Sequence, residues 1–205
     1  MRKRYNEDLS NVKDMAAYIM DLVGLSYENL DLFLNDGKKE SLQTIREIHE
    51  DITREARQME RLSFELMALQ QPIARDLRLL QMSIKLSSTY KRIASHFDQV
   101  CLILLNYDLS KREKEILKDF IKSEEKMAKN AISAFLNKDK ALGQETIEAD
   151  YLNNELFKIA IEYIACENKA NKIEAVELSE KVLLYKYFER LGDRLARVAD
   201  LSKRL

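Results

Sequence analysis

The chain has 205 residues, enough for one domain or two small ones, and contains one proline and four glycines. Because so few residues break or turn the backbone, the composition predicts a mostly helical protein. The 34 basic and 35 acidic residues give a net charge of −1, so no overall attraction draws the protein to nucleic acid, and we expect no nucleic-acid partner. No apolar run has the length of a transmembrane helix, and no apolar signal core follows the basic start, so we expect a cytoplasmic protein.

Apolar residues recur at helical spacing over six segments. The first two helices are predicted from Tyr5 to Asn35 and from Lys38 to Leu69, separated by a turn at Gly37. The third is predicted from Pro72, which suits the first turn of a helix, to Leu104. The last three are predicted over residues 110–136, 141–166 and 173–205. The fold class is therefore all-α.

Local signals mark two of these helix ends. Ser110 and Glu113 have the spacing of a capping box, in which the serine hydroxyl accepts a backbone N–H and the glutamate reaches back to the serine N–H. The polar stretch 167–172, which contains no proline, is predicted to separate the fifth helix from the sixth.

The second half of the chain resembles the first. FLNDGKK at residues 33–39 resembles FLNKDK at 135–140, and YKRIASHFDQV at 90–100 resembles FERLGDRLARV at 188–198. The two matches have nearly equal offsets, 102 and 98 residues, which indicates an internal duplication. We therefore predict two tandem three-helix bundles, residues 1–106 and 107–205, each burying one apolar stripe per helix.

Acidic residues share one stripe of the sixth helix. Glu189, Asp193 and Asp200 fall within about 40° of one another and opposite the apolar stripe. Asp150 and Asn154 are likewise four residues apart on the fifth helix. Side chains one turn apart are neighbours, so these oxygens could converge on one cation. A solvated face in which the acids pair with nearby arginines is the commoner arrangement, and spacing alone leaves both open.

A family resemblance favours the cation. ERLGDRLARVAD at residues 189–200 resembles the signature of the PhoU family of phosphate-uptake regulators, and ALQQPIARDLRLL at 68–80 resembles the turn between its second and third helices. The resemblance covers nearly the whole chain. It implies two three-helix bundles related by a pseudo-two-fold repeat, and metal ions bound on acidic clusters. It also implies a cytoplasmic homodimer that docks to a phosphate ABC transporter ATPase and a sensor histidine kinase, and that meets the membrane only through these partners.

The motif transfers to the second repeat only. Glu189 and Asp193 match the acidic pair, Asp200 matches the acid that follows, and Asp150 with Asn154 matches the half on the fifth helix. These five residues are the predicted metal ligands, for a divalent or trivalent ion that the sequence does not identify among iron, zinc, magnesium and manganese. In the first repeat, the corresponding positions hold residues other than acids, namely Lys91, Ser95, His49 and Thr53. A protonated lysine cannot ligate a cation, so we expect one metal cluster instead of two.

Nothing in the sequence indicates an enzyme. A di-iron oxidase would need Glu-x-x-His on two helices, but Arg46 precedes His49 and Ile93 precedes His96 at that spacing. The histidines are therefore predicted to be surface or boundary residues. No phosphate-binding glycine loop and no activated nucleophile is present. A group of basic residues on the third helix is interpreted as a solvated face, with a docking surface for an acidic partner or phosphate as the alternative: Arg75, Arg78, Lys85, Lys91 and Arg92.

The leading hypothesis is a PhoU-like regulator of phosphate uptake and phosphate-starvation signalling that acts by docking. The first alternative is an adaptor of the same fold for another transporter or kinase, which the lost acids of the first repeat favour. The second alternative is a carboxylate protein that binds or stores metal.

Overall fold

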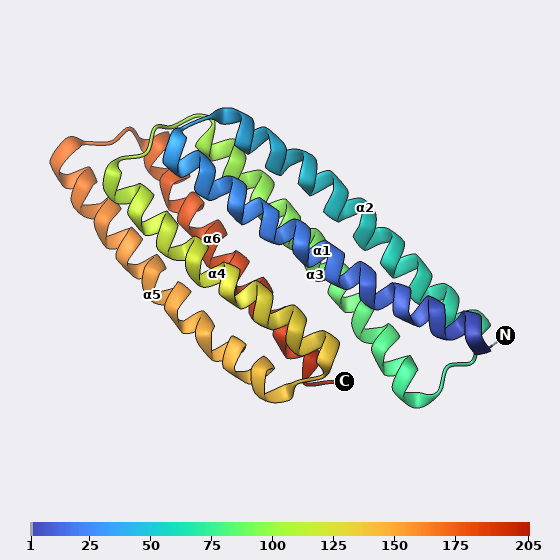
Figure 1. The fold of residues 1–205 in the computed structure, drawn as a ribbon. Helices are drawn as coiled ribbons and strands as arrows, with labels where there is room; N and C mark the ends of the chain where they lie inside the picture. The colour runs from blue at the N-terminus through green and yellow to red at the C-terminus, as the bar shows by residue number, and fades with distance from the viewer. Residues whose placement is uncertain (1) are drawn as a thin grey trace.

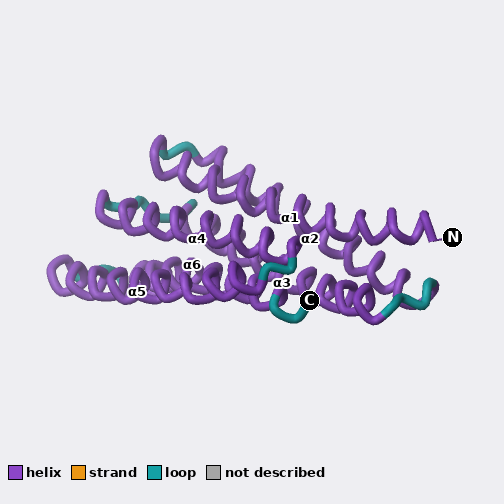
Figure 2. Tube along the Cα trace, turned by 60° about the horizontal axis from the view of Figure 1, so that its bottom comes forward, coloured by secondary structure: helices purple, strands orange, loops and turns teal. Residues whose placement is uncertain are grey.

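The computed structural model describes residues 2–205, with side chains from residue 3 onward, and every regular element in this range is a helix (Figures 1 and 2). The all-α prediction is confirmed. Short loops join the ends of six long helices, as the teal segments of Figure 2 show. The helices are α1 (Arg2–Asp36), α2 (Lys39–Leu69), α3 (Ala74–Leu104), α4 (Lys111–Asn137), α5 (Lys140–Asn171) and α6 (Ala175–Ser202).

The helices form two three-helix bundles, α1–α3 and α4–α6, that lie side by side (Figure 1). The bundles meet where α3 packs against α6 and α1 packs against α4. Within the described residues, α2 and α5 contact only helices of their own bundle, so each forms an outer wall. This arrangement leaves the α5–α6 face at one side of the molecule, where both helices can present side chains to solvent.

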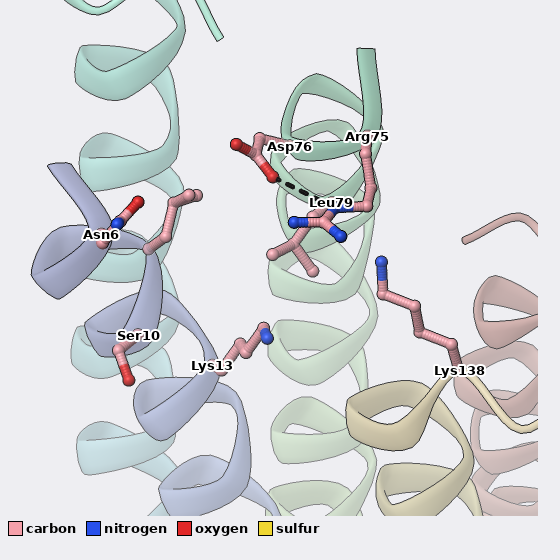
Figure 3. A pocket seen from close by; sticks show the side chains of 8 residues that line it. Asn6, Ser10, Lys13, Arg75, Asp76, Leu79 and Lys138 are labelled. Carbon is pink, nitrogen blue, oxygen red and sulfur yellow. Dashed lines mark ion pairs between the residues drawn. The ribbon is translucent and has the colours of Figure 1, made fainter. Parts of the chain in front are cut away.

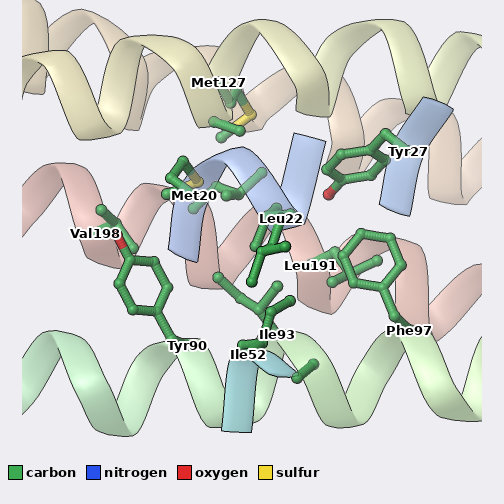
Figure 4. Close-up of a cluster of buried hydrophobic side chains, with 14 of the residues drawn as sticks. Met20, Leu22, Tyr27, Ile52, Tyr90, Ile93, Phe97, Met127, Leu191 and Val198 are labelled. Carbon is green, nitrogen blue, oxygen red and sulfur yellow. The ribbon is translucent and has the colours of Figure 1, made fainter. Parts of the chain in front are cut away.

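One continuous hydrophobic core connects the two bundles. It contains fully buried aromatic side chains from both repeats, and Figure 4 shows part of it, including Tyr90 and Phe97 of α3 and Leu191 of α6. The Tyr90 hydroxyl donates to the Ala16 carbonyl at 2.8 Å, so this buried polar group is satisfied. Each large apolar side chain buried here contributes about 1.5–3 kcal/mol, and many of them lie between the repeats.

The predicted capping box is confirmed. The Ser110 hydroxyl accepts the Glu113 N–H at 3.2 Å, and the Glu113 carboxylate accepts the Ser110 N–H at 2.8 Å. The predicted turn after α1 is also present, with Gly37 at φ +72°, a conformation that glycine adopts without a steric penalty.

Two predicted helix boundaries were wrong. Pro72 lies before α3 instead of in its first turn, because the chain stays extended through Ile73, the N-cap residue. The fifth helix does not end at Cys166 but continues to Asn171. No proline or glycine interrupts that stretch, and the Glu174 carboxylate accepts the N–H groups of Val176 and Glu177, which fixes the start of α6 at Ala175.

None of the helices in residues 2–205 combines the length and apolar character that a membrane crossing requires.

Candidate functional site

Gly192 sets the close approach of α6 to α5. A Cβ atom at this position would lie 2.6 Å from the Asp150 carboxylate and closer still to the Asn153 amide nitrogen. An interior glycine costs a helix about 1 kcal/mol relative to alanine. Here that cost is offset because the absent side chain lets two polar residues of α5 sit against the backbone of α6.

Asp150 lies half-buried beneath this contact and faces two acids of α6. Its carboxylate accepts the Asn153 amide at 3.2 Å, and Asn154 also points its amide back to the Asp150 backbone carbonyl at 3.1 Å. Burial raises the pKa of Asp150, and the nearby charges of Asp193 and Glu189 raise it further. Three of the four predicted carboxylates, on two helices, therefore lie near enough for their charges to interact.

Glu189 holds an unsatisfied carboxylate oxygen. The residue is buried, and its Oε1 accepts Lys186 Nζ at 2.6 Å. Its Oε2 is also buried and has no hydrogen-bond partner among the described residues. Such an orphaned anionic oxygen is the kind of atom that a cation or an ordered water satisfies.

Asp200 stands apart from these three acids. It lies about two turns beyond Asp193 along α6. Its Oδ2 accepts Arg197 at 2.7 Å and Arg204 at 2.8 Å, so two guanidinium groups already compensate its charge. Across residues 2–205, no three His, Cys, Asp or Glu side chains are close enough to share a metal ion. Ligation by Asp150, Asn154, Glu189, Asp193 and Asp200 stays a prediction.

Glu124 of α4 is a fully buried acid that the sequence pattern had not marked as a site residue. Burial raises the pKa of Glu124 well above its usual range, which favours the neutral carboxyl; Tyr27 acts in the opposite direction, and the charge of Asp150 raises the pKa further. The signal was available in the spacing, because Glu124 falls on the apolar stripe of α4 between Ile121 and Ala128. Asp150, Glu189 and Asp193 form an acidic face on α5 and α6. Glu124 adds a buried carboxyl group near this face, between the repeats.

The first repeat has an ion pair at the corresponding place. Lys91, which matches Glu189, donates to Glu60 Oε2 of α2 at 2.7 Å, and Ser87 donates to the same oxygen at 3.1 Å. The hydrogen bond from Lys91 lowers the pKa of Glu60. The ammonium group of Lys91 thus occupies the position that a carboxylate holds in the second repeat. Ser95, at the position of the second acid, is exposed.

The protein is a duplicated six-helix bundle with one shared core and with an acidic face on one repeat only. These features define a class of helical repeat proteins whose sites lie on the surfaces of the helices. The chain belongs to the PhoU family: the family model described as the PhoU domain matches it twice, over residues 12–104 and 117–202. The resemblance seen in the signature motifs is thereby confirmed, together with the two-repeat fold. The exact division at residues 106 and 107 stays a prediction.

Similar proteins span nearly the whole chain. A phosphate-specific transport system accessory protein PhoU homolog 1 from Methanothermobacter thermautotrophicus is 24% identical over 97% of this chain and 90% of its own length. A phosphate-specific transport system accessory protein PhoU homolog from Zymomonas mobilis is also 24% identical, over 97% of this chain and 85% of its own length. The crystal structure of PhoU from Pseudomonas aeruginosa superposes with a TM-score of 0.89 at 21% identity, covering 97% of this chain and 96% of that one. The phosphate transport system regulatory protein PhoU from Streptococcus pneumoniae gives 0.86 at 17% identity, covering 97% and 94%.

Proposed function

We propose that this protein is a regulatory accessory protein of a phosphate-specific transport system. The observation that carries the proposal is the double match to the PhoU domain. It is supported by relatives that are described as accessory proteins of such systems and that align with 97% of the chain. The proposed role is protein docking in the cytoplasm and not catalysis, with membrane contact only through partners.

In this mechanism a homodimer bridges the transporter ATPase and a sensor histidine kinase, and it holds the kinase in its inhibitory state when phosphate is abundant. The long helices suit such a task, because a rigid bundle presents extended faces to two partners at once. Deleting the gene should derepress phosphate-starvation genes in cells grown at high phosphate, measured as transcript abundance. Unchanged expression at high phosphate would count against the regulatory role.

We further propose that the acidic face of α5 and α6 binds a metal ion. Asp150, Asn154, Glu189 and Asp193 would supply the oxygen ligands once their side chains turn toward one another, and Glu189 Oε2 is an oxygen with no other described partner. Asp200 would add a ligand only if Arg197 and Arg204 released it. The bound ion would neutralise the clustered carboxylates and so stiffen the contact between the two helices.

The direct test is the double variant Glu189→Ala/Asp193→Ala. Metal content per chain, measured by elemental analysis of protein purified without chelator, should fall. Glu145→Ala/Glu148→Ala removes two exposed acids of α5 and serves as the matched control that keeps its metal. Equal metal in the wild type and the Glu189/Asp193 variant would show that the ligands are assigned incorrectly. Stoichiometric redox-active iron with oxidase turnover would instead favour a metal-storage protein.

The ion pair between Lys91 and Glu60 favours a second candidate, an adaptor of the same fold for a different transporter or kinase. A face that has exchanged carboxylates for an ammonium would select a different partner surface. A pull-down from cells grown at high phosphate, read by mass spectrometry, separates the two candidates: the first predicts a phosphate transporter ATPase and a histidine kinase, and the second predicts other partners.

A further inference from the structure

Four cationic side chains gather where α1, the start of α3 and the turn after α4 meet. Figure 3 shows Lys13, Arg75 and Lys138 around one cavity. The fourth, Arg78, lies one turn beyond Arg75 on α3 and close enough to influence Lys138. The cavity has a volume of about 380 Å³, and its polar lining also includes Asn6, Ser10 and Asp76. These residues come from three distant parts of the chain. The positive surface is therefore created by the fold and not by consecutive basic residues.

The positive charge here is only partly compensated. Among the residues that the structure describes, Asp76 is the one acid that lines the cavity, and both of its oxygens are engaged. Its Oδ1 lies 3.7 Å from Arg75 Nε, and its Oδ2 accepts the Tyr5 hydroxyl at 3.4 Å. Within residues 2–205, neither Lys13 nor Lys138 forms an ion pair. Two ammonium groups thus face a concave space without an ion-pair partner of their own.

The positive charges of this cluster affect the pKa of Lys138. Burial lowers the pKa of Lys138, and the charges of Arg75 and Lys13 lower it further, although Asp76 acts in the opposite direction. Mutual repulsion among cations is unfavourable in the free protein. A bound anion relieves it, because the anion interacts favourably with every member of the cluster at once.

The lining chemistry identifies the class of anion. Lysines act as point charges and arginine as a planar fork of donors, and both recognise the oxygens of phosphate. Ser10 and Asn6 offer further hydrogen-bond donors. The volume lies in the range of small-molecule sites, and a recess between helices suits a small ligand better than the flat surface of a macromolecule. We infer that this cavity binds a phosphate group, either as inorganic phosphate or carried on a nucleotide.

The cavity contains no residue of the acidic face, so phosphate binding here does not depend on the proposed metal site or on the proposed docking function. The test is calorimetric titration of the full-length protein at low ionic strength, with chelator present to keep metal from the acidic face. Orthophosphate, ATP and sulfate are titrated separately. Saturable binding of orthophosphate or ATP is expected, and the tighter of the two identifies the source of the phosphate group.

The variant Lys13→Gln/Lys138→Gln should lower that affinity about tenfold or more, since it removes charge-assisted hydrogen bonds. Lys122→Gln/Lys126→Gln removes two exposed lysines of α4 and should leave the affinity within about twofold, because distant exposed charges are screened. Arg75→Gln should also lower the affinity. Because this side chain is 75% exposed, the substitution should preserve folding. The proposal is overturned if neither ligand binds at millimolar concentration, if the Lys13/Lys138 variant binds like the wild type, or if sulfate binds as tightly as orthophosphate.

Discussion

Gly192 and Gly24 are both interior glycines of long helices, yet their surroundings differ. A Cβ at Gly192 would clash with Asp150 and Asn153, whereas a Cβ at Gly24 would meet nothing within 4 Å. Gly192→Ala should therefore destabilise the protein by about 1–3 kcal/mol, because overpacking outweighs the gain in helix propensity. Gly24→Ala should stabilise it by about 0.5–1 kcal/mol. Urea unfolding of both variants measures the difference, and a stabilised Gly192→Ala would disprove the close approach of α5 and α6.

His96 gives the stability of the protein a pH dependence. Burial lowers the pKa of His96 to about 4, and the charges of Arg194, Arg190 and Arg92 add to the effect. An unfolded histidine has a pKa of about 6.5. Between these values the unfolded chain binds a proton that the folded chain does not, so stability falls as the pH drops from 6.5 toward 4.

Because the ring is partly exposed, we expect this loss to be about 1–2 kcal/mol after allowance for solvent screening. His96→Gln should lack this contribution, so its free energy of unfolding should fall less between pH 7 and pH 4.5 than that of the wild type. Parallel pH profiles of the two proteins would contradict the assignment. The boundary position of His96 was predicted from the sequence, but Arg190 and Arg194 were not foreseen as neighbours because they belong to the other repeat.

At the scale of single helices, Ser110 fixes the start of α4. Its hydroxyl and the Glu113 carboxylate satisfy two backbone N–H groups that no helical carbonyl can reach. Ser110→Ala should lower the free energy of unfolding by about 1 kcal/mol. Ser95→Ala, at an exposed position inside α3, is the control and should change it by less than about 0.5 kcal/mol. Equal effects of the two substitutions, in thermal unfolding, would mean that the cap contributes nothing.

Lys181 joins the three helices of the second repeat. Its buried ammonium lies 3.1 Å from Glu113 of α4, 3.3 Å from Glu177 of α6 and 3.7 Å from Glu167 of α5. Although burial opposes its charge, the three glutamates together raise the pKa of Lys181. The ion cluster therefore links elements that are far apart in sequence.

Lys181→Met should destabilise the protein by about 3–5 kcal/mol, because it leaves the Glu113 carboxylate buried without its partner. The double variant Lys181→Met/Glu113→Gln should recover part of that loss, since the uncompensated charge is gone. Urea unfolding of the single and double variants forms the measurement. A double variant less stable than Lys181→Met would show that the buried charge is not the source of the cost.

The sequence predicted all six helices because periodicity extends over many turns, but it located some of their ends poorly. The polar stretch after Cys166 could form either a loop or further helix. It forms helix up to Asn171, because the cap from Glu174 places the start of the next helix only at Ala175. For the candidate site, i to i+4 spacing predicted the shared stripe of Glu189 and Asp193. It could not predict that Arg204, beyond the motif, would help to engage Asp200.

At the scale of the whole molecule, the duplication predicted two units but not the way they combine. Sequence self-similarity reports what each repeat contains, whereas the packing of α3 on α6 and of α1 on α4 depends on contacts about a hundred residues apart in sequence. A core that continues across both contacts makes independent unfolding of the repeats unfavourable, because separation would expose the apolar faces of four helices. We therefore expect the repeats to unfold together.

Leu191 allows this expectation to be tested. It is fully buried on α6, the helix that packs against α3 of the other repeat. Leu191→Ala should cost about 2–5 kcal/mol through lost burial and the cavity left behind. Native-state hydrogen exchange should then show the same loss of protection in the most protected amides of α2 and of α5, since both exchange through one cooperative opening. Leu152→Ala, at a side chain of α5 that is 53% exposed, controls for shortening a leucine without opening the core. A loss confined to α5 would mean that the second repeat opens by itself and that the shared core does not couple the two bundles.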